Sequence, residues 1–172
     1  SPEEVGVKRA RAALSEGRVE DATARAQDVL DTWPASAHTM ELEYIIKRAA
    51  AGNPTKAKRV GILLPLSGAY APAAQHLKQV IKLANESEGA PLELMFADTA
   101  GTAEQTIHQI ESLVIEHGCV AIMGPLLKEN GEIAAQRAQA LRTPMVALTQ
   151  GGDPASVGSF VFRGFLPLDQ QV

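Results

Sequence analysis

The chain contains 172 residues with a formal net charge of −4, and 45% of its residues are hydrophobic. This composition is too apolar for a disordered chain and is sufficient for a buried core. The mild acidity and the small number of aromatic residues (one Trp, two Tyr and four Phe) argue against a nucleic-acid-binding surface, and no apolar run approaches the roughly 20 residues of a membrane span.

Cysteine usage excludes two kinds of stabilisation. Cys119 is the only cysteine, so the chain cannot form an internal disulfide, and no Cys/His group has the spacing of a zinc site. We therefore predict no metal site. The chain opens with Ser1 and has neither an initiator methionine nor a signal-like apolar stretch, which we interpret as a processed or trimmed start.

A break near Gly52-Asn53-Pro54 predicts two parts. We expect a helical segment over residues 1–52, a linker over 53–58 and an α/β domain over 59–172. Residues 1–58 hold nine basic and nine acidic residues, so the whole net charge lies in the second part.

The first part predicts three helices. Apolar residues recur at helical spacing in each, and Gly17 and Pro34 separate them. The residues expected to face inward are Val7, Ala10, Leu14, Ala22, Ala26, Val29, Leu30, Met40, Tyr44 and Ile45. The third helix should run from about residue 36 to 51.

The second part predicts a parallel α/β sheet, because short apolar runs alternate with amphipathic stretches. The expected strands are 59–66, 91–98, 119–123, 144–148 and 159–162. Helices should follow the first three strands, over about 73–88, 102–117 and 129–141. Their expected buried residues are Ala73, Leu77, Val80, Ile81, Ala84, Ala103, Ile107, Ile110, Val114, Ile133, Ala134, Ala138 and Leu141. Thr102 and Gln105 have the spacing of a capping box.

A charged residue inside the second strand, Glu93, is typical of a sheet edge. We therefore predict a doubly wound, Rossmann-like sheet of order 2-1-3-4-5. Ligands of such sheets lie beyond the carboxyl ends of the strands, where the strand order reverses. That rule brings together three loops, at 67–70, 124–128 and 149–152.

Ser67 and Gly68 offer a hydroxyl and a free backbone N–H before a helix, an arrangement that suits a carboxylate or another anionic group. Thr149 and Gln150 could add hydrogen bonds, and Tyr70 could cover an apolar ligand. The alternative is an ordinary turn and helix cap.

Catalysis and cofactor binding find no support in the motifs. The loop after the first strand has a single glycine, whereas a dinucleotide fingerprint needs three and a P-loop also needs a lysine. Ser67 lacks the flanking glycine and the placed histidine of a nucleophile elbow. We predict no enzyme and no cofactor.

Several motifs in order resemble those of type 1 periplasmic binding proteins, the fold of the leucine/isoleucine/valine-binding proteins. They are GILLPLSGAYA, Asp98 at the end of the second strand, AIMGPLL, PMVALTQ and FVFRGFLPLDQQ. The resemblance implies the first lobe of a two-lobed receptor that closes on a ligand. The lobe's wall would comprise Ser67, Gly68, Ala69, Tyr70, Gly124, Pro125, Leu126, Leu127, Thr149 and Gln150. The segment Leu126-Leu127-Lys128-Glu129 follows the third strand where amino-acid binders tend to place Ser or Thr, a difference that argues against amino-acid binding.

The helical segment is similar to a tetratricopeptide repeat, because small residues and a closing proline recur at Ala10, Ala13, Gly17, Ala22, Ala26, Val29 and Pro34. A generic helical hairpin is the alternative. Helical repeats before a type 1 binding fold resemble the penicillin-binding-protein activator lipoproteins. That resemblance implies a periplasmic lipoprotein, anchored to the outer membrane, that regulates a peptidoglycan synthase through protein contacts.

The leading hypothesis is therefore a non-enzymatic envelope lipoprotein. The alternative is a solute receptor of an ABC transporter that binds amino acids of the branched-chain type or a similar small anionic ligand. One lobe supplies only half a cleft, so we expect the chain to fold but to bind small ligands weakly.

Overall fold

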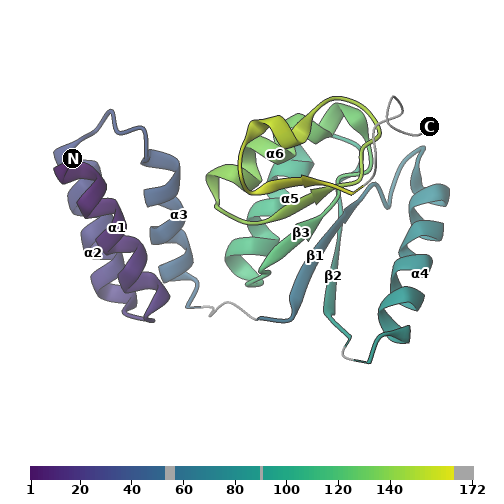
Figure 1. Cartoon of the computed structure of the whole chain (residues 1–172), viewed down its shortest axis with the longest axis horizontal. Coiled ribbons are helices and arrows are strands. Elements are labelled where there is room, and N and C mark those ends of the chain that lie inside the picture. The colour runs from purple at the N-terminus through teal and green to yellow at the C-terminus, as the bar shows by residue number, and fades with distance from the viewer. Residues whose placement is uncertain (53–56, 90, 165–172) are drawn as a thin grey trace. The chain divides into compact units, whose positions relative to one another are not determined.

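A computed structural model describes residues 1–52, 57–89 and 91–164 (Figure 1). The chain divides into two compact units, Ser1–Pro54 and Thr55–Val172. Each unit has a hydrophobic core of its own. They are called here the helical unit and the α/β unit.

The helical unit consists of α1 (Pro2–Ser15), α2 (Val19–Thr32) and α3 (Thr39–Ala50). A capping box opens α1, in which the Ser1 side chain accepts the backbone N–H of Glu4 at 3.2 Å. Gly17, with φ of +74°, lies in the turn to α2. A left-handed conformation costs glycine little, so the residue allows the abrupt reversal between the two helices.

Four fully buried alanines pack α1 against α2, namely Ala10, Ala13, Ala22 and Ala26. Small side chains let the two backbones approach closely, and larger ones, such as Leu42 and Ile45 from α3, complete the core. Trp33, just after α2, packs against the edge of this core. The predicted inward position of Met40 is wrong, because the residue is 48% exposed. The helix begins at Thr39, and its buried face runs through Leu42, Ile45 and Ala49.

The α/β unit contains a five-stranded, all-parallel sheet of order β2-β1-β3-β4-β5. This confirms the predicted fold class and strand order. The strands are β1 (Arg59–Leu64), β2 (Glu93–Asp98), β3 (Ala121–Met123), β4 (Met145–Ala147) and β5 (Val161–Arg163). They lie within or close to the expected ranges but are mostly shorter, since residues such as Leu66 and Cys119 bond outside the strand ladder.

The helices lie on both faces of this sheet (Figure 1). Helix α4 (Ala71–Ser87) covers one face, and α5 (Ala103–Glu111) and α6 (Gly131–Ala140) cover the other. Right-handed crossovers require this division, because the chain moves one way from β1 to β2 and the opposite way afterwards. Three short helices complete the unit: η1 (Ser112–Glu116), η2 (Lys128–Asn130) and η3 (Pro154–Val157).

The interior strand β1 contributes the most deeply buried residues of the sheet's core. Ile62, Leu63 and Leu64 are fully buried, and Ile62 pairs with Phe96 on one side and Met123 on the other. Strand β2 forms the predicted edge, and its first residue, Glu93, pairs with Arg59 of the neighbouring strand. The charge therefore lies where solvent reaches it.

Two predicted helix faces are wrong in detail. In α4 the inward residues are Ala74, Leu77 and Ile81, and the predicted Ala73, Val80 and Ala84 are exposed. The apolar residues of α4 cover a wider arc of the helix than the sheet buries. Their periodicity alone therefore could not show which of them face the sheet.

The second error concerns α5, where Ala103 is exposed in the first turn and Thr106 is buried. The Thr102 side chain does accept the backbone N–H of Gln105, at 3.2 Å. The predicted helix then widens into the π-helical η1, in which the N–H of His117 reaches the carbonyl of Ser112 at 3.0 Å. The third helix also begins later than predicted, because η2 precedes α6.

Candidate functional site

A hollow of about 600 Å³ lies at the carboxyl ends of the strands and is called here the strand-end hollow. Tyr70 comes from the loop after β1, Leu148, Gln150 and Gly151 follow β4, and the segment after β3 contributes Leu126, Leu127, Lys128 and Glu129. Open α/β sheets bind ligands at this position because the loops diverge where the strand order reverses.

A carboxylate at the end of β2 fixes the loop after β1. The Oδ1 atom of Asp98 accepts the backbone N–H groups of Leu66 at 2.8 Å and Ser67 at 3.2 Å. It also accepts the N–H of Ala100 at 2.8 Å. One oxygen therefore joins the loop after β1 to the loop after β2. The loop after β1 enters α4 in a defined position as a result.

These bonds also determine the protonation of Asp98. Burial by itself would raise the pKa of Asp98, but hydrogen bonds from the Ser67 side chain and from the N–H groups of Ala100, Ser67 and Leu66 lower it below the usual value. Hydrogen bonds to the charged form favour that form. The group is therefore ionised at neutral pH.

For this reason Ser67 does not supply the free backbone N–H predicted at Ser67-Gly68. The N–H of Ser67 and its side chain are both engaged by Asp98. A ligand would have to displace the carboxylate to use them. The sequence placed Asp98 at the end of the second strand but did not predict its bonds to the neighbouring loop.

The segment after β3 passes very close to β1. Gly124 has φ of +110°, and a Cβ atom there would lie 2.4 Å from the carbonyl oxygen of Leu63. Only glycine fits this approach, and the chain then turns outward to Leu126, which packs on the core under α4. The side chains that the segment after β3 contributes to the hollow thus follow a turn that is packed tightly against β1.

Lys128 lies across Gly151, the residue that ends the opposite wall. A Cβ atom at Gly151 would lie 2.5 Å from Cδ of Lys128 and 2.9 Å from its Cε. The aliphatic stem therefore packs on bare backbone. The carbonyl of Gly151 is itself fixed, because it accepts the hydroxyl of the buried Thr149 at 3.1 Å.

Four of the ten predicted wall residues line the strand-end hollow: Tyr70, Leu126, Leu127 and Gln150. Thr149 is buried behind the wall and positions Gly151. Ser67, Gly68, Ala69, Gly124 and Pro125 belong to the supporting loops and are not among the lining residues.

The prediction did not include Leu148, and it named Lys128 and Glu129 only as residues that argue against amino-acid binding, not as part of the wall. Topology could have suggested them, because they adjoin the ends of β3 and β4.

The lining has a definite chemistry. Leu126, Leu127 and Leu148 supply apolar surface, and Tyr70 adds an aromatic ring that is 53% exposed. Lys128 and Glu129 supply opposite charges next to each other. An apolar surface with a few polar groups is typical of small-molecule sites.

Within the described residues, no group of three His, Cys, Asp or Glu side chains could hold a metal ion. Searched over the same part of the chain, no helix combines the length and hydropathy that crossing a membrane requires.

Residues 58–170 match a family model described as "Periplasmic binding protein". A comparison with curated proteins finds no match. Solved structures with a similar fold include the leucine-binding protein LivK from Thermotoga maritima, which has 19% identity and a TM-score of 0.59 over 63% of this chain and 33% of that one.

A second is a solute-binding protein of an ABC transporter from Rhodopseudomonas palustris BisB5, in complex with 3,4-dihydroxy benzoic acid (19% identity, TM-score 0.60, 65% of this chain and 32% of that one). A third is the branched-chain amino acid transporter substrate-binding protein LivJ from Streptococcus pneumoniae, in complex with isoleucine (17% identity, TM-score 0.55, 65% of this chain and 34% of that one). The chain spans about a third of the length of these proteins.

Proposed function

The chain belongs to the periplasmic binding protein family, and from that premise we propose that residues 59–172 form the first lobe of a small-molecule receptor, a binding protein and not an enzyme. The strand-end hollow carries the proposal, because it lies where open α/β sheets place their ligands. Residues 1–52 form a separate helical domain, and 53–58 a linker. The location expected of such a receptor is periplasmic or extracellular.

The lining favours a zwitterion with an apolar side chain, such as a branched-chain amino acid. Lys128 would pair with the α-carboxylate and Glu129 with the α-amino group, while Leu126 and Leu148 contact the side chain. Lys128 and Glu129 would thus bind the ligand's backbone groups, which amino-acid binders tend to bind with Ser or Thr. An aromatic acid would engage only Lys128 and the apolar surface.

The site residues are proposed on the same basis. Tyr70, Leu126 and Gln150 contact the ligand directly. Ser67, Gly68, Ala69, Gly124, Pro125 and Thr149 position the loops, with Asp98 and Gly151 as their anchors.

The test is ligand titration of the 172-residue chain, followed by backbone amide NMR shifts. The probes are L-leucine, L-leucinamide, which lacks the carboxylate, and 4-hydroxybenzoate, which lacks the amine. We expect leucine to shift the amides of the strand-end hollow with millimolar affinity, because one lobe buries only one side of the ligand. Leucinamide should bind at least threefold more weakly.

Two charge variants separate the amino-acid and aromatic-acid hypotheses. Lys128→Met keeps the aliphatic stem and should weaken both leucine and 4-hydroxybenzoate. Glu129→Gln should weaken leucine alone. The exposed Lys47 of the helical unit supplies a control, Lys47→Met, which should change neither. If leucine shifted the amide signals of Lys128→Met and of the unaltered chain equally, the proposed ligand contacts would be contradicted.

A second function is favoured by the helical unit, which packs its own core around α1, α2 and α3. The solved receptors account for up to 65% of this chain. In this second proposal the protein is an envelope lipoprotein, anchored to the outer membrane, whose tetratricopeptide-like helices contact a peptidoglycan synthase. Co-purification of a synthase with the chain, lost on deletion of residues 1–52, would support it. Retention of the synthase after that deletion would contradict it.

A further inference from the structure

The helical unit carries a second hollow, of about 250 Å³, lined by Arg9, Ala12, Arg18 and Arg25 and called here the arginine hollow. Arg9 and Ala12 come from α1, and Arg25 comes from α2. Arg18 lies in the turn between the helices, at the start of α2. Three arginines, from α1, from the turn and from α2, thus line one depression, whose remaining lining residue is an alanine.

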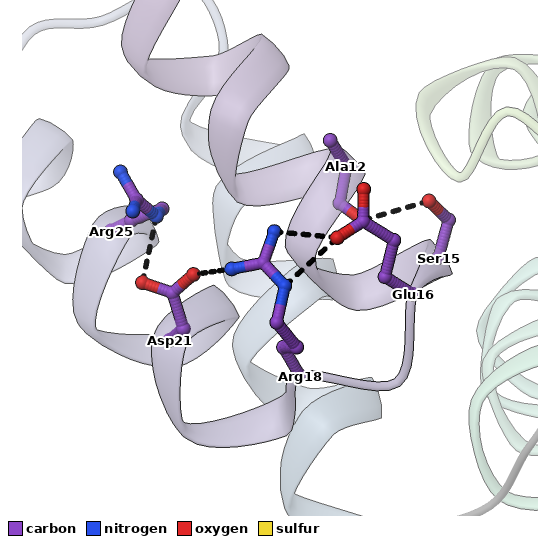
Figure 2. A network of polar contacts seen from close by, with 6 residues as sticks. All are labelled: Ala12, Ser15, Glu16, Arg18, Asp21 and Arg25. Carbon is purple, nitrogen blue, oxygen red and sulfur yellow. Dashed lines mark hydrogen bonds and ion pairs between the residues drawn. The ribbon is translucent and has the colours of Figure 1, made fainter.

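Two of these arginines are held by neighbouring carboxylates (Figure 2). Arg18 donates to Glu16 through Nε at 2.8 Å and through a terminal nitrogen at 2.7 Å, and it also pairs with Asp21. Arg25 contacts Asp21 through Nε at 2.7 Å. The hydrogen bond from Arg25 lowers the pKa of Asp21 most strongly, burial opposes this effect, and the charges of Arg25 and Arg18 lower the pKa further, so Asp21 is ionised at neutral pH.

Arg9 differs from the other two. Across residues 1–52, 57–89 and 91–164, no ion pair engages its guanidinium, and its side chain is exposed. The three arginines and two carboxylates therefore leave the arginine hollow with one uncompensated positive charge.

The single excess positive charge of the arginine hollow determines which kind of anion it can bind. A single carboxylate neutralises it and can accept paired N–H donors from a guanidinium. A phosphate dianion or a polyanion would add charge beside Glu16 and Asp21, and these acids would repel it. The volume fits one small group better than an extended backbone. Charge complementarity therefore favours an isolated carboxylate over a nucleic acid or an anionic lipid surface.

We propose that the arginine hollow binds the side-chain carboxylate of an acidic segment on a partner protein, with Arg9 as the principal contact and Arg18 and Arg25 as flanking donors. The site is independent of the strand-end hollow, because all its residues belong to the helical unit. It gives the helical unit a binding role of its own.

The test follows the arginine Nε–Hε NMR signals of the 172-residue chain during titration with the peptide Ac-Gly-Glu-Gly-Glu-Gly-NH2. The control peptide replaces both glutamates with glutamine. We expect the acidic peptide to shift the signals of Arg9, Arg18 and Arg25 and to leave those of Arg59 and Arg163 in place. The glutamine peptide should produce no shift. Raising the ionic strength should weaken binding, because the contact is exposed.

Variants assign the contact. Arg9→Gln should weaken peptide binding about fivefold, the effect of one exposed ion pair at its upper limit. Lys8→Gln removes the same charge one residue away, outside the arginine hollow, and should change binding less than twofold. Both sites are exposed on α1 and glutamine is a good helix former, so the fold should be retained. Arg25→Gln provides a second variant on the other helix and should also weaken binding.

Three outcomes would overturn the proposal: equal losses in Arg9→Gln and Lys8→Gln, uniform shifts across all arginines, or tighter binding of inorganic phosphate or phosphatidylglycerol vesicles than of the acidic peptide. Leucine binding at the strand-end hollow should be unchanged in Arg9→Gln, so failure of this site and failure of the receptor function are distinguishable.

Discussion

The Oδ1 atom of Asp98 at the end of β2 accepts the backbone N–H of Leu66, beyond the end of β1, at 2.8 Å. A residue of the edge strand thus fixes the loop that leaves the neighbouring strand β1. Because Tyr70 of the strand-end hollow belongs to that loop, the position of one wall depends on a carboxylate that does not line it.

Loss of this carboxylate should destabilise the α/β unit. Asp98→Ala removes the acceptor of three backbone N–H groups, and we expect the free energy of unfolding to fall by about 2 kcal/mol. Asp98→Asn keeps an oxygen acceptor and should cost about half as much. Urea unfolding followed by far-UV circular dichroism measures both. Asp28→Asn, at an exposed position of α2, is the control and should be neutral.

The stability provided by Asp98 should depend on pH in a defined direction. Its pKa is lower in the folded chain than in the unfolded one, so the unfolded state binds the proton more readily. The stabilisation is complete above the unfolded value of about 4 and is lost as pH falls through the folded value. The difference between the unaltered chain and Asp98→Asn should therefore be constant from pH 5 to 7 and shrink below pH 4. A difference that grows on acidification would contradict this assignment.

Gly124 should tolerate no side chain. In Gly124→Ala the new Cβ would meet the carbonyl oxygen of Leu63 at 2.4 Å, with a backbone φ of +110°. Backbone cannot move aside as a side chain can, so we expect a loss of about 2 kcal/mol or more in urea unfolding. Gly89→Ala, where a Cβ would meet nothing within 4 Å, is the matched control and should cost little.

Gly151→Ala should separate binding from stability. Its Cβ would displace the stem of Lys128 from a distance of 2.5 Å, but that stem is flexible and can move. We expect a change in stability of less than about 1 kcal/mol. Leucine binding should weaken at least twofold, because the ammonium group loses its support. A variant that binds leucine unchanged would show that Lys128 need not rest on Gly151.

The link between α1 and α3 should contribute measurably to the helical unit. Nε of Arg11 donates to Oε1 of Glu41 at 2.7 Å, and the side chain of Glu41 is only 11% exposed. Glu41→Gln should lower stability by about 1 kcal/mol, a value reduced by the partial exposure of Arg11. Glu43→Gln, at an exposed position of the same helix, should have no effect on urea unfolding.

Topology was predictable because it follows from local patterns. Alternating strands and helices imply right-handed crossovers, and the charge of Glu93 identified the edge. The buried face of α4 was not predictable, because Ala73 and Val80 continue the apolar arc beside Ala74 and Leu77. Nor was the contact of Lys128 with Gly151, which depends on how two loops distant in sequence meet. The helices and strands thus follow from local sequence patterns, whereas the lining of the strand-end hollow depends on contacts between distant segments.

The chain's one tryptophan and one cysteine fall in different units. Trp33 packs against the core of the helical unit, and Cys119 is 2% exposed in the α/β unit. Emission from the indole therefore reports the opening of one unit, and the rate at which a thiol reagent labels the sulfur reports the opening of the other. The unaltered protein thus carries separate intrinsic reporters for its two halves, and comparing their midpoints would measure how far the two unfold together.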